Sequence, residues 1–187
     1  MPLAITEIVC AILLWGNISC RISRPVYKKL WKALNALLFV LSVILILYLT
    51  VLRRTAGDSE FSPVPFSTYY RAYLYQKAGK YTLAREMFRT TLMNVLLFLP
   101  FGLSLSALLP EKLSIRRRIF ITVIAGALFS IGIESAQYAF SLGSAETDDL
   151  IMNSVGSLGG ALHLALAGWN RMYDGDESSR SREYYDL

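Results

Sequence analysis

The residues of this chain that can do chemistry are concentrated between Ser130 and Gly160, a stretch that begins inside one apolar run and ends inside the next. A carboxylate in hydrocarbon is costly unless it is neutralised, paired or facing water, so ionisable residues in such a stretch indicate a functional site. The polar side chains of the stretch include Glu134, Gln137, Asp148, Asp149 and Asn153.

Two kinds of chemistry are open to these acids. Glu134 could act as a general acid or base, and Asp148 with Asp149 could hold a divalent cation through oxygen ligands. Alternatively, Glu134 is a hydrogen-bonded acid that joins helices, and the aspartates cap a helix. The chain has no nucleophile beside a base, no His or Cys set at metal-ligand spacing and no glycine-rich phosphate loop. We therefore expect no cofactor, and no metal other than that cation.

The composition places these residues in a membrane protein. Of the 187 residues, 54% are apolar and 18% are charged, and several apolar runs approach the ~20 residues that a helix needs to cross a bilayer. We predict an all-α, polytopic membrane helical bundle of about five transmembrane helices, with interfacial helices in a long extracellular loop. The net charge of +5 comes from Lys and Arg between apolar runs, where they set orientation, so nucleic acid is not an expected partner.

The apolar runs divide the chain into three parts. Residues 1–32 form an N-terminal helix and a basic cytoplasmic loop, residues 33–169 form the transmembrane domain, and residues 170–187 form a hydrophilic tail that we expect to be disordered. The first run is short and contains Glu7, so it either crosses the membrane or lies re-entrant. The expected membrane helices are residues 3–18, 33–52, 92–110, 119–140 and 150–169.

The long polar segment 53–91 separates the second and third runs. Pro63 and Pro65 favour an extended backbone in its first part. Its second part is rich in Tyr, Arg and Lys, and amphipathic aromatic rings prefer the headgroup zone. We predict one or two interfacial helices here, with a bend between Lys77 and Tyr81.

Orientation follows from the short loops. Residues 21–32 carry five Lys and Arg, residues 112–118 carry four, and residues 141–148 carry none. The positive-inside rule puts the first two loops in the cytoplasm and the third outside. The protein is then a multi-pass protein of the cell membrane, with the N-terminus outside if five helices cross and the C-terminus cytoplasmic.

In that orientation the polar side chains gather in the outer third of the bilayer. Asn94 lies at the outer end of its helix, on the same side as Glu134. Phe66 lies on the connected outer loop, and Asp148 lies at the outer edge of this group. Two stripes of small residues support close contact between the helices that carry these side chains, because small residues let helices approach closely in lipid. One carries Gly156 and Gly160, and the other leads to Glu134. We expect the two helices that carry these stripes to pack together, so that Glu134 faces Asn153.

Three motifs stand in order along the chain: NVLLFLPFG at residues 94–102, Ser130 with IESAQ at residues 133–137, and DDLIMNSVG at residues 148–156. Together with Pro65-Phe66, they resemble the VanZ-like family of bacterial membrane proteins over about residues 51–166. The family is named for a member associated with teicoplanin resistance. Many members carry an Arg shortly before the Asp pair, whereas residues 141–147 have no basic residue here. We therefore expect Glu134 to be neutralised without such an arginine.

The residues and the resemblance leave two functions open. In the first, the site binds an envelope lipid or an amphiphilic glycopeptide at the outer leaflet and lowers susceptibility to teicoplanin-type antibiotics. Its ligand-binding residues are then Asn94, Gln137, Asp148, Asp149, Asn153 and Phe66. Nearby basic residues would attract phosphate headgroups, namely Arg53, Arg54, Arg71, Lys77 and Lys80. In the second, the protein is an intramembrane enzyme that acts on a lipid-linked cell-wall precursor, with Glu134 as the catalytic acid or base.

Overall fold

The computed structural model describes residues 25–57 and 60–185, and it describes side chains only from Lys29 to Ala167. Within this part of the chain, four helices are long and apolar enough to cross a membrane: Lys29–Leu52, Tyr81–Leu108, Ile115–Ala139 and Thr147–Ala167. The all-α membrane bundle predicted from the sequence is therefore confirmed. The expected crossing at residues 3–18 lies outside the described residues, so a count of five stays a prediction.

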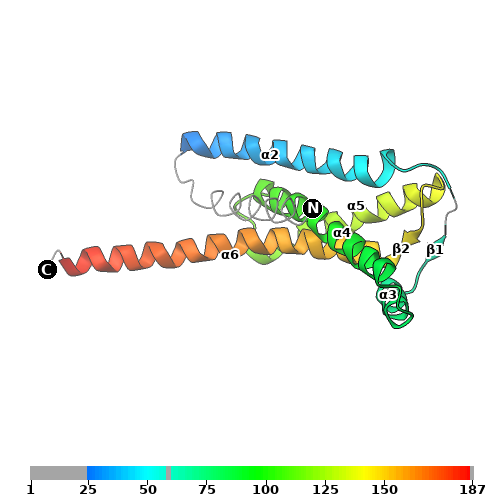
Figure 1. Cartoon of the computed structure of the whole chain (residues 1–187). Helices are drawn as coiled ribbons and strands as arrows, with labels where there is room; N and C mark the ends of the chain where they lie inside the picture. Colours follow the sequence, from blue (N-terminus) through cyan, green and yellow to red (C-terminus); the bar gives the residue numbers. More distant parts are fainter. Residues whose placement is uncertain (1–24, 58–59, 186–187) are drawn as a thin grey trace.

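The helices form a bundle in which α6 packs most extensively against α4, and then against α5. Figure 1 shows α2 along one side of the bundle, α6 along the other, and α4 crossing obliquely between them. The elements in chain order are α2 (Pro25–Leu47), the π-helical turn η1 (Tyr48–Leu52), β1 (Phe61–Ser62), α3 (Ser67–Lys77), α4 (Tyr81–Leu108), α5 (Ile115–Ala139), β2 (Ala145–Glu146) and α6 (Thr147–Tyr185).

All the polar connections that matter for the site meet at one end of the bundle. The connection from η1 to α3 and the connection from α5 to α6 lie there together with α3, so we name it the α3 end (Figure 1). The turn between α4 and α5 lies at the opposite end. The sequence predicts that the α3 end is outside the cell. The multi-pass membrane architecture is established, whereas this orientation stays a prediction.

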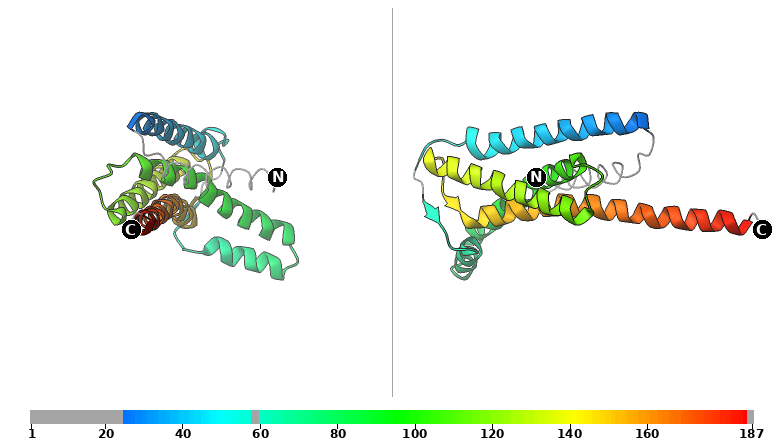
Figure 2. Two further views of the ribbon diagram at one scale, coloured as in Figure 1. Left: turned by 90° about the vertical axis from the view of Figure 1, so that its left-hand side faces the viewer. Right: turned by 180° about the vertical axis from the view of Figure 1, so that it is seen from behind.

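Helix α4 begins earlier than its apolar run. The bend predicted between Lys77 and Tyr81 is present, and Gly79 adopts φ +74° there, a left-handed conformation that glycine adopts at little cost. No Gly or Pro follows until Pro100, so α4 starts at Tyr81 and continues without a break into the membrane. Helix α3 and the first turns of α4 thus form a hairpin that projects from the bundle (Figure 2).

The predicted packing of α5 on α6 is confirmed, with Gly126 of α5 tight against the Ser157 side chain. Gly156 and Gly160 of α6, however, face α4. A Cβ atom at Gly156 would overlap the carbonyl of Val95, and one at Gly160 would overlap the carbonyl of Leu99. Gly102 of α4 is similarly tight against the backbone of Ser157. These contacts bring two backbones together in lipid, where small residues at the interface permit close packing. We call Gly102, Gly156 and Gly160 the glycine layer.

The apolar core lies beside the glycine layer. Phe98 and Phe101 of α4 are buried with Ile46 of α2 and Ile133 of α5. The Phe101 ring stacks on that of Phe129, with centroids 5.5 Å apart. The core therefore joins α2, α4 and α5, while the glycine layer joins α4 to α6.

Helix α6 continues to Tyr185, well past the end of its apolar part at Ala167. Residues 170–185 are thus helical in the structure, where the sequence analysis expected a tail without regular structure. The division of the chain into three domains stays a prediction.

Candidate functional site

A pair of very short strands closes the α3 end. Strands β1 and β2 pair in parallel, with Phe61 opposite Ala145 and Ser62 opposite Glu146. The amide of Ala145 donates to the carbonyl of Glu60 at 2.8 Å, and the Thr147 hydroxyl donates to the carbonyl of Ser62 at 3.3 Å. The segment before α3 is thereby held against the beginning of α6.

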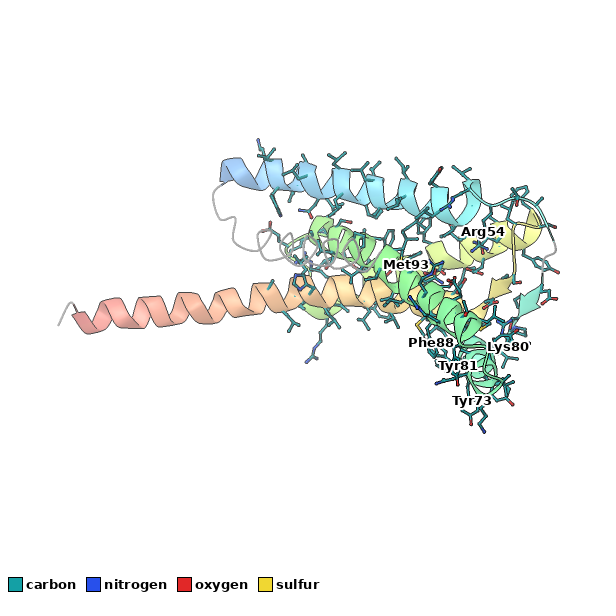
Figure 3. The ribbon with its side chains drawn as sticks, in the orientation of Figure 1. Arg54, Tyr73, Lys80, Tyr81, Phe88 and Met93 are labelled. Atoms are coloured by element: carbon teal, nitrogen blue, oxygen red, sulfur yellow. The ribbon has the colours of Figure 1, made fainter. Side chains whose placement is uncertain are left out.

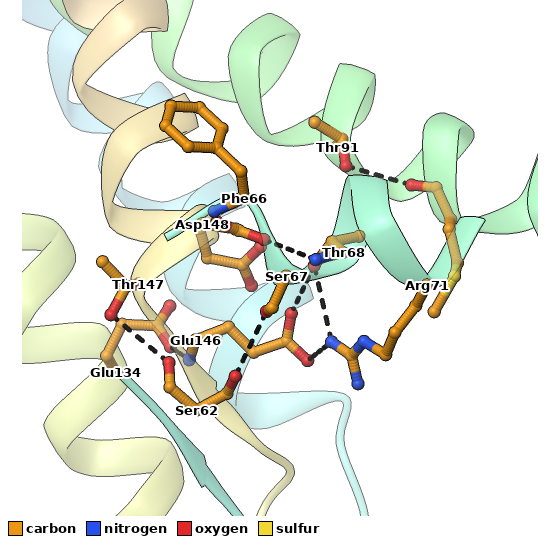
Figure 4. Close-up of polar contacts among 12 residues, drawn as sticks. Ser62, Phe66, Ser67, Thr68, Arg71, Thr91, Glu134, Glu146, Thr147 and Asp148 are labelled. Atoms are coloured by element: carbon orange, nitrogen blue, oxygen red, sulfur yellow. Dashed lines mark hydrogen bonds and ion pairs between the residues drawn. The ribbon is translucent and has the colours of Figure 1, made fainter. Parts of the chain in front are cut away.

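Asp148 joins α6 to α3. Its carboxylate accepts hydrogen bonds from the amide of Phe66 and, at 2.8 Å, from the amide of Thr68. These amides belong to the first turn of α3, where helix N–H groups lack partners within the helix and favour a negative charge. Asp148 is 2% exposed, so it caps α3 from a buried position (Figure 4).

Phe66 contributes to this contact through its backbone. It adopts φ +62°, which turns its amide toward Asp148, while its ring is exposed and lies 6.2 Å from the Tyr69 ring. Tyr69 in turn donates to the sulfur of Met152 at 3.5 Å. Burial and the charge of Asp148 raise the pKa of Tyr69, so this phenol stays protonated and remains a donor.

Glu146 is a member of the site that the sequence analysis missed. Its carboxylate accepts from the Arg71 guanidinium at 3.0 Å and from the Thr68 hydroxyl at 2.9 Å (Figure 4). Its position two residues before the Asp pair is the one signal for it in the sequence. It precedes the apolar run, however, where an acid is typical of an ordinary loop.

Glu134 and Asp149 lie close together beneath this contact. Glu134 accepts from the amide of Glu146 at 3.0 Å, and Asp149 accepts from the Asn94 side-chain amide at 2.6 Å. The two carboxylates repel one another, and Arg54 attracts both. We call Glu134, Glu146, Asp148 and Asp149 the carboxylate cluster.

Arg54 reaches the cluster from the end of η1, at the α3 end of the bundle (Figure 3). Its guanidinium lies directly against Gly143, where a side chain would overlap it, and where φ is +144°. Glu134 therefore does have a nearby arginine, which corrects the expectation drawn from residues 141–147. The cation comes from a distant part of the chain.

A cavity of about 460 Å³ opens beside the cluster, between the end of α5 and the beginning of α6. Its walls are mostly apolar, and Glu134 lies in its lining. Its polar lining comes from Glu134, Ser135, Glu146 and Thr147, and its apolar lining includes Phe61, Ile131 and Tyr138. Three of these are large exposed hydrophobic residues: Phe61, Ile131 and Tyr138. An acid thus lines a cavity whose rim offers apolar surface to lipid.

The family model for VanZ/LLP1 matches residues 26–168, which include all four membrane-crossing helices and the carboxylate cluster. The chain belongs to the VanZ/LLP1 family. No curated protein and no solved structure matches it.

The three VanZ-like motifs meet only in part at the α3 end. Asn94 of the first motif and Asp149 of the third are in direct contact, and Glu134 of the second lies beside them. Gln137 instead donates to the carbonyl of Thr50 in η1 at 2.8 Å, satisfying an acceptor near the end of that helix. Asn153 donates to the Ser130 hydroxyl at 2.9 Å. Ser130 is one helical turn from Glu134, so Asn153 contacts α5 one turn away from Glu134 and not Glu134 itself.

The two aspartates of the VanZ-like motif have different hydrogen-bond partners. Asp148 uses both oxygens on the α3 amides, whereas Asp149 binds Asn94. Among the residues that the structure describes, no group of three His, Cys, Asp or Glu is arranged to hold a metal ion. Asp148 and Asp149 thus both make contacts between helices, whereas Glu134 and Glu146 line the cavity.

Proposed function

We propose that this VanZ/LLP1 membrane protein binds a lipid or another amphiphile of the bacterial cell envelope at the outer leaflet, and thereby lowers susceptibility to teicoplanin-type antibiotics. The observation that carries the proposal is the cavity between α5 and α6, which combines the Glu134 carboxylate with a rim of exposed apolar side chains. Polar groups that fix orientation within a mainly apolar cavity are typical of small-molecule sites.

The surface next to the cavity suits an acyl chain. Ile131 at the rim is followed along α5 by Leu128 and Ile124, which are 63% and 44% exposed. Positions three and four residues apart lie on the same face of a helix, so these side chains extend the apolar rim toward the middle of the membrane. A ligand with its polar group at Glu134 would lay its chain along this face.

The α3–α4 hairpin suits the headgroup zone. Tyr70, Tyr73, Tyr81 and Phe88 are all exposed on it, and Figure 3 shows Tyr73, Lys80, Tyr81 and Phe88 gathered on the part that projects from the bundle. The Lys77 ammonium lies 5.0 Å from the centre of the Tyr73 ring. Aromatic and basic side chains together favour the membrane–water interface and its phosphate groups. The hairpin would hold the cavity at the depth of lipid headgroups.

The link to antibiotics follows from the shape of the ligand that the site would accept. Lipoglycopeptides are amphiphiles that act at the outer surface of the membrane. A protein that binds such a molecule, or that retains an envelope lipid needed for its action, would reduce the amount acting on the cell wall.

The test is the substitution Glu134→Gln in a strain whose own copy of the protein has been deleted. Gln keeps the size and a hydrogen-bond acceptor but removes the charge, so we expect teicoplanin susceptibility to return to that of the deletion strain. The matched control is Glu86→Gln, which removes an exposed acid paired with Arg89 on α4 and is expected to retain protection. Full protection by Glu134→Gln at equal membrane abundance would contradict the proposal.

A second candidate function is an intramembrane enzyme acting on a lipid-linked precursor. The proximity of Glu134 and Asp149 favours it, because paired carboxylates in a shared site can divide acid and base roles. Mass spectrometry of envelope lipids separates the two functions. An enzyme would alter lipid composition on overexpression, and Asp149→Asn would abolish the change, whereas a binding protein would leave the composition unchanged.

A further inference from the structure

We infer that the ligand of the cavity is a lipid whose headgroup carries a primary ammonium group. The inference rests on the proposed function, since it specifies the chemical class of the bound amphiphile. It is carried by the charges around the cavity, by the acceptors that line it and by the apolar face that leads away from it.

The carboxylate cluster contains more acids than arginines. Two guanidinium groups reach its four acids: Arg71 pairs with Glu146, and Arg54 acts on Glu134 and Asp149. The acids thus exceed the arginines by two within the described residues. A cation entering the cavity would give a buried acid an ionised partner, which lowers the cost of its charge, whereas an anion would not.

The distribution of hydrogen bonds identifies Glu134 as the acid available to that cation. Asp148 is engaged by two amides, Asp149 by the Asn94 amide, and Glu146 by Arg71 and Thr68. Glu134 accepts a single backbone hydrogen bond, through Oε2, while lining the cavity. Its other oxygen therefore remains an acceptor for a ligand.

A primary ammonium group matches the acceptors of the cavity. It has three N–H donors and no acceptor. The lining offers the Glu134 carboxylate and two hydroxyl oxygens, those of Ser135 and Thr147. A quaternary ammonium has no N–H to donate, and an acylated amine has lost the charge, so both would bind less well. Hydrogen bonds to an ionised partner are roughly twice as strong as neutral ones.

The apolar face of α5 favours a lipid over a water-soluble amine. A soluble amine would use only the polar wall, whereas Ile131, Leu128 and Ile124 continue the rim along the membrane-crossing helix. Burial of a hydrocarbon chain against such a face would add to the contact that the headgroup makes.

The experiment is competitive photocrosslinking with the full-length protein in nanodiscs. The probe is phosphatidylethanolamine with a diazirine in one acyl chain, and the competitors are phosphatidylethanolamine, N-acetyl-phosphatidylethanolamine, phosphatidylglycerol and the chain-free glycerophosphoethanolamine. We expect phosphatidylethanolamine to compete about tenfold better than its N-acetylated form, as loss of one charge-assisted contact implies. Glycerophosphoethanolamine is expected not to compete.

The variant Glu134→Gln should remove this discrimination while still being crosslinked, and Glu86→Gln should keep it. Equal competition by all three lipids in the wild-type protein would overturn the inference and leave the proposed function standing. Competition by glycerophosphoethanolamine equal to that of the lipid would also overturn it, in favour of a soluble amine. The variant Ile131→Trp fills the cavity and should reduce crosslinking. If crosslinking is unchanged in this variant, the proposed function is overturned as well.

Discussion

The α3 end and the glycine layer are two parts of the same pair of helices, α4 and α6, held together by opposite means. In the glycine layer the backbones of α4 and α6 touch and little side chain intervenes. At the α3 end the two helices are connected by the hydrogen bond from Asn94 to Asp149, while Asp148 connects α6 to α3. Close packing in the first region supplies rigidity, and this allows the second to keep charged groups beside a cavity.

The largest effect is expected from filling the glycine layer. Gly160→Ala would push a methyl group into the carbonyl of Leu99 and the amide of Leu103, which are backbone atoms that cannot rotate away. Overpacking of this kind costs about 1–3 kcal/mol or more. Thermal melting of a fluorescent fusion, followed by size exclusion, measures the loss.

The matched control for that prediction is the neighbouring glycine. A Cβ atom at Gly159 would meet nothing within 4 Å, so Gly159→Ala should melt at or above the wild-type temperature, because Ala favours a helix more than Gly does. If the two variants lose equal stability, close packing of α4 on α6 is not what holds this region.

A smaller effect, confined to the α3 end, is expected from Asp148→Ala. The change leaves the amides of Phe66 and Thr68 without their acceptor. The expected cost is about 1–2 kcal/mol, because the Phe66 contact is only part-buried and water can reach it. Hydrogen exchange should accelerate in α3 and leave the middle of α6 protected. Uniform acceleration across the bundle would show that the two regions are not independent.

The smallest effect is expected at the rim of the cluster. The Arg71 and Glu146 side chains are 41% and 20% exposed, and exposed ion pairs contribute about 0–1 kcal/mol. Arg71→Gln should therefore leave the melting temperature nearly unchanged in the same assay. A loss as large as that of Asp148→Ala would place this pair among the main contacts of the α3 end.

The sequence predicts the membrane helices well because length and apolarity determine them directly. The α2, α4, α5 and α6 crossings all appear near their apolar runs. Helices were predicted on both sides of the bend before Tyr81, but not that the second one continues into the membrane as part of α4. The polar residues between Tyr81 and Leu92 hide this continuity, since they end the apolar run.

The site was predictable as a set of residues but not as a set of contacts. Glu134, Asn94 and Asp149 do come together, because they enter from the same end of neighbouring helices. Small residues occur on α4, α5 and α6, so the partner of Gly156 could not be chosen from the pattern. Arg54 and the two-residue strands depend on contacts between segments about 80 residues apart, and such short strands carry no periodic signal.

The unbroken course of α4 has a mechanical consequence. One continuous rod runs from Tyr81, beside the exposed tyrosines, to Leu108 at the far end of the bundle, with its middle fixed against α6. If crowded headgroups tilt the hairpin, α4 would rotate about its contact with α6. A displacement of the hairpin at the membrane surface would thus also displace the turn between α4 and α5.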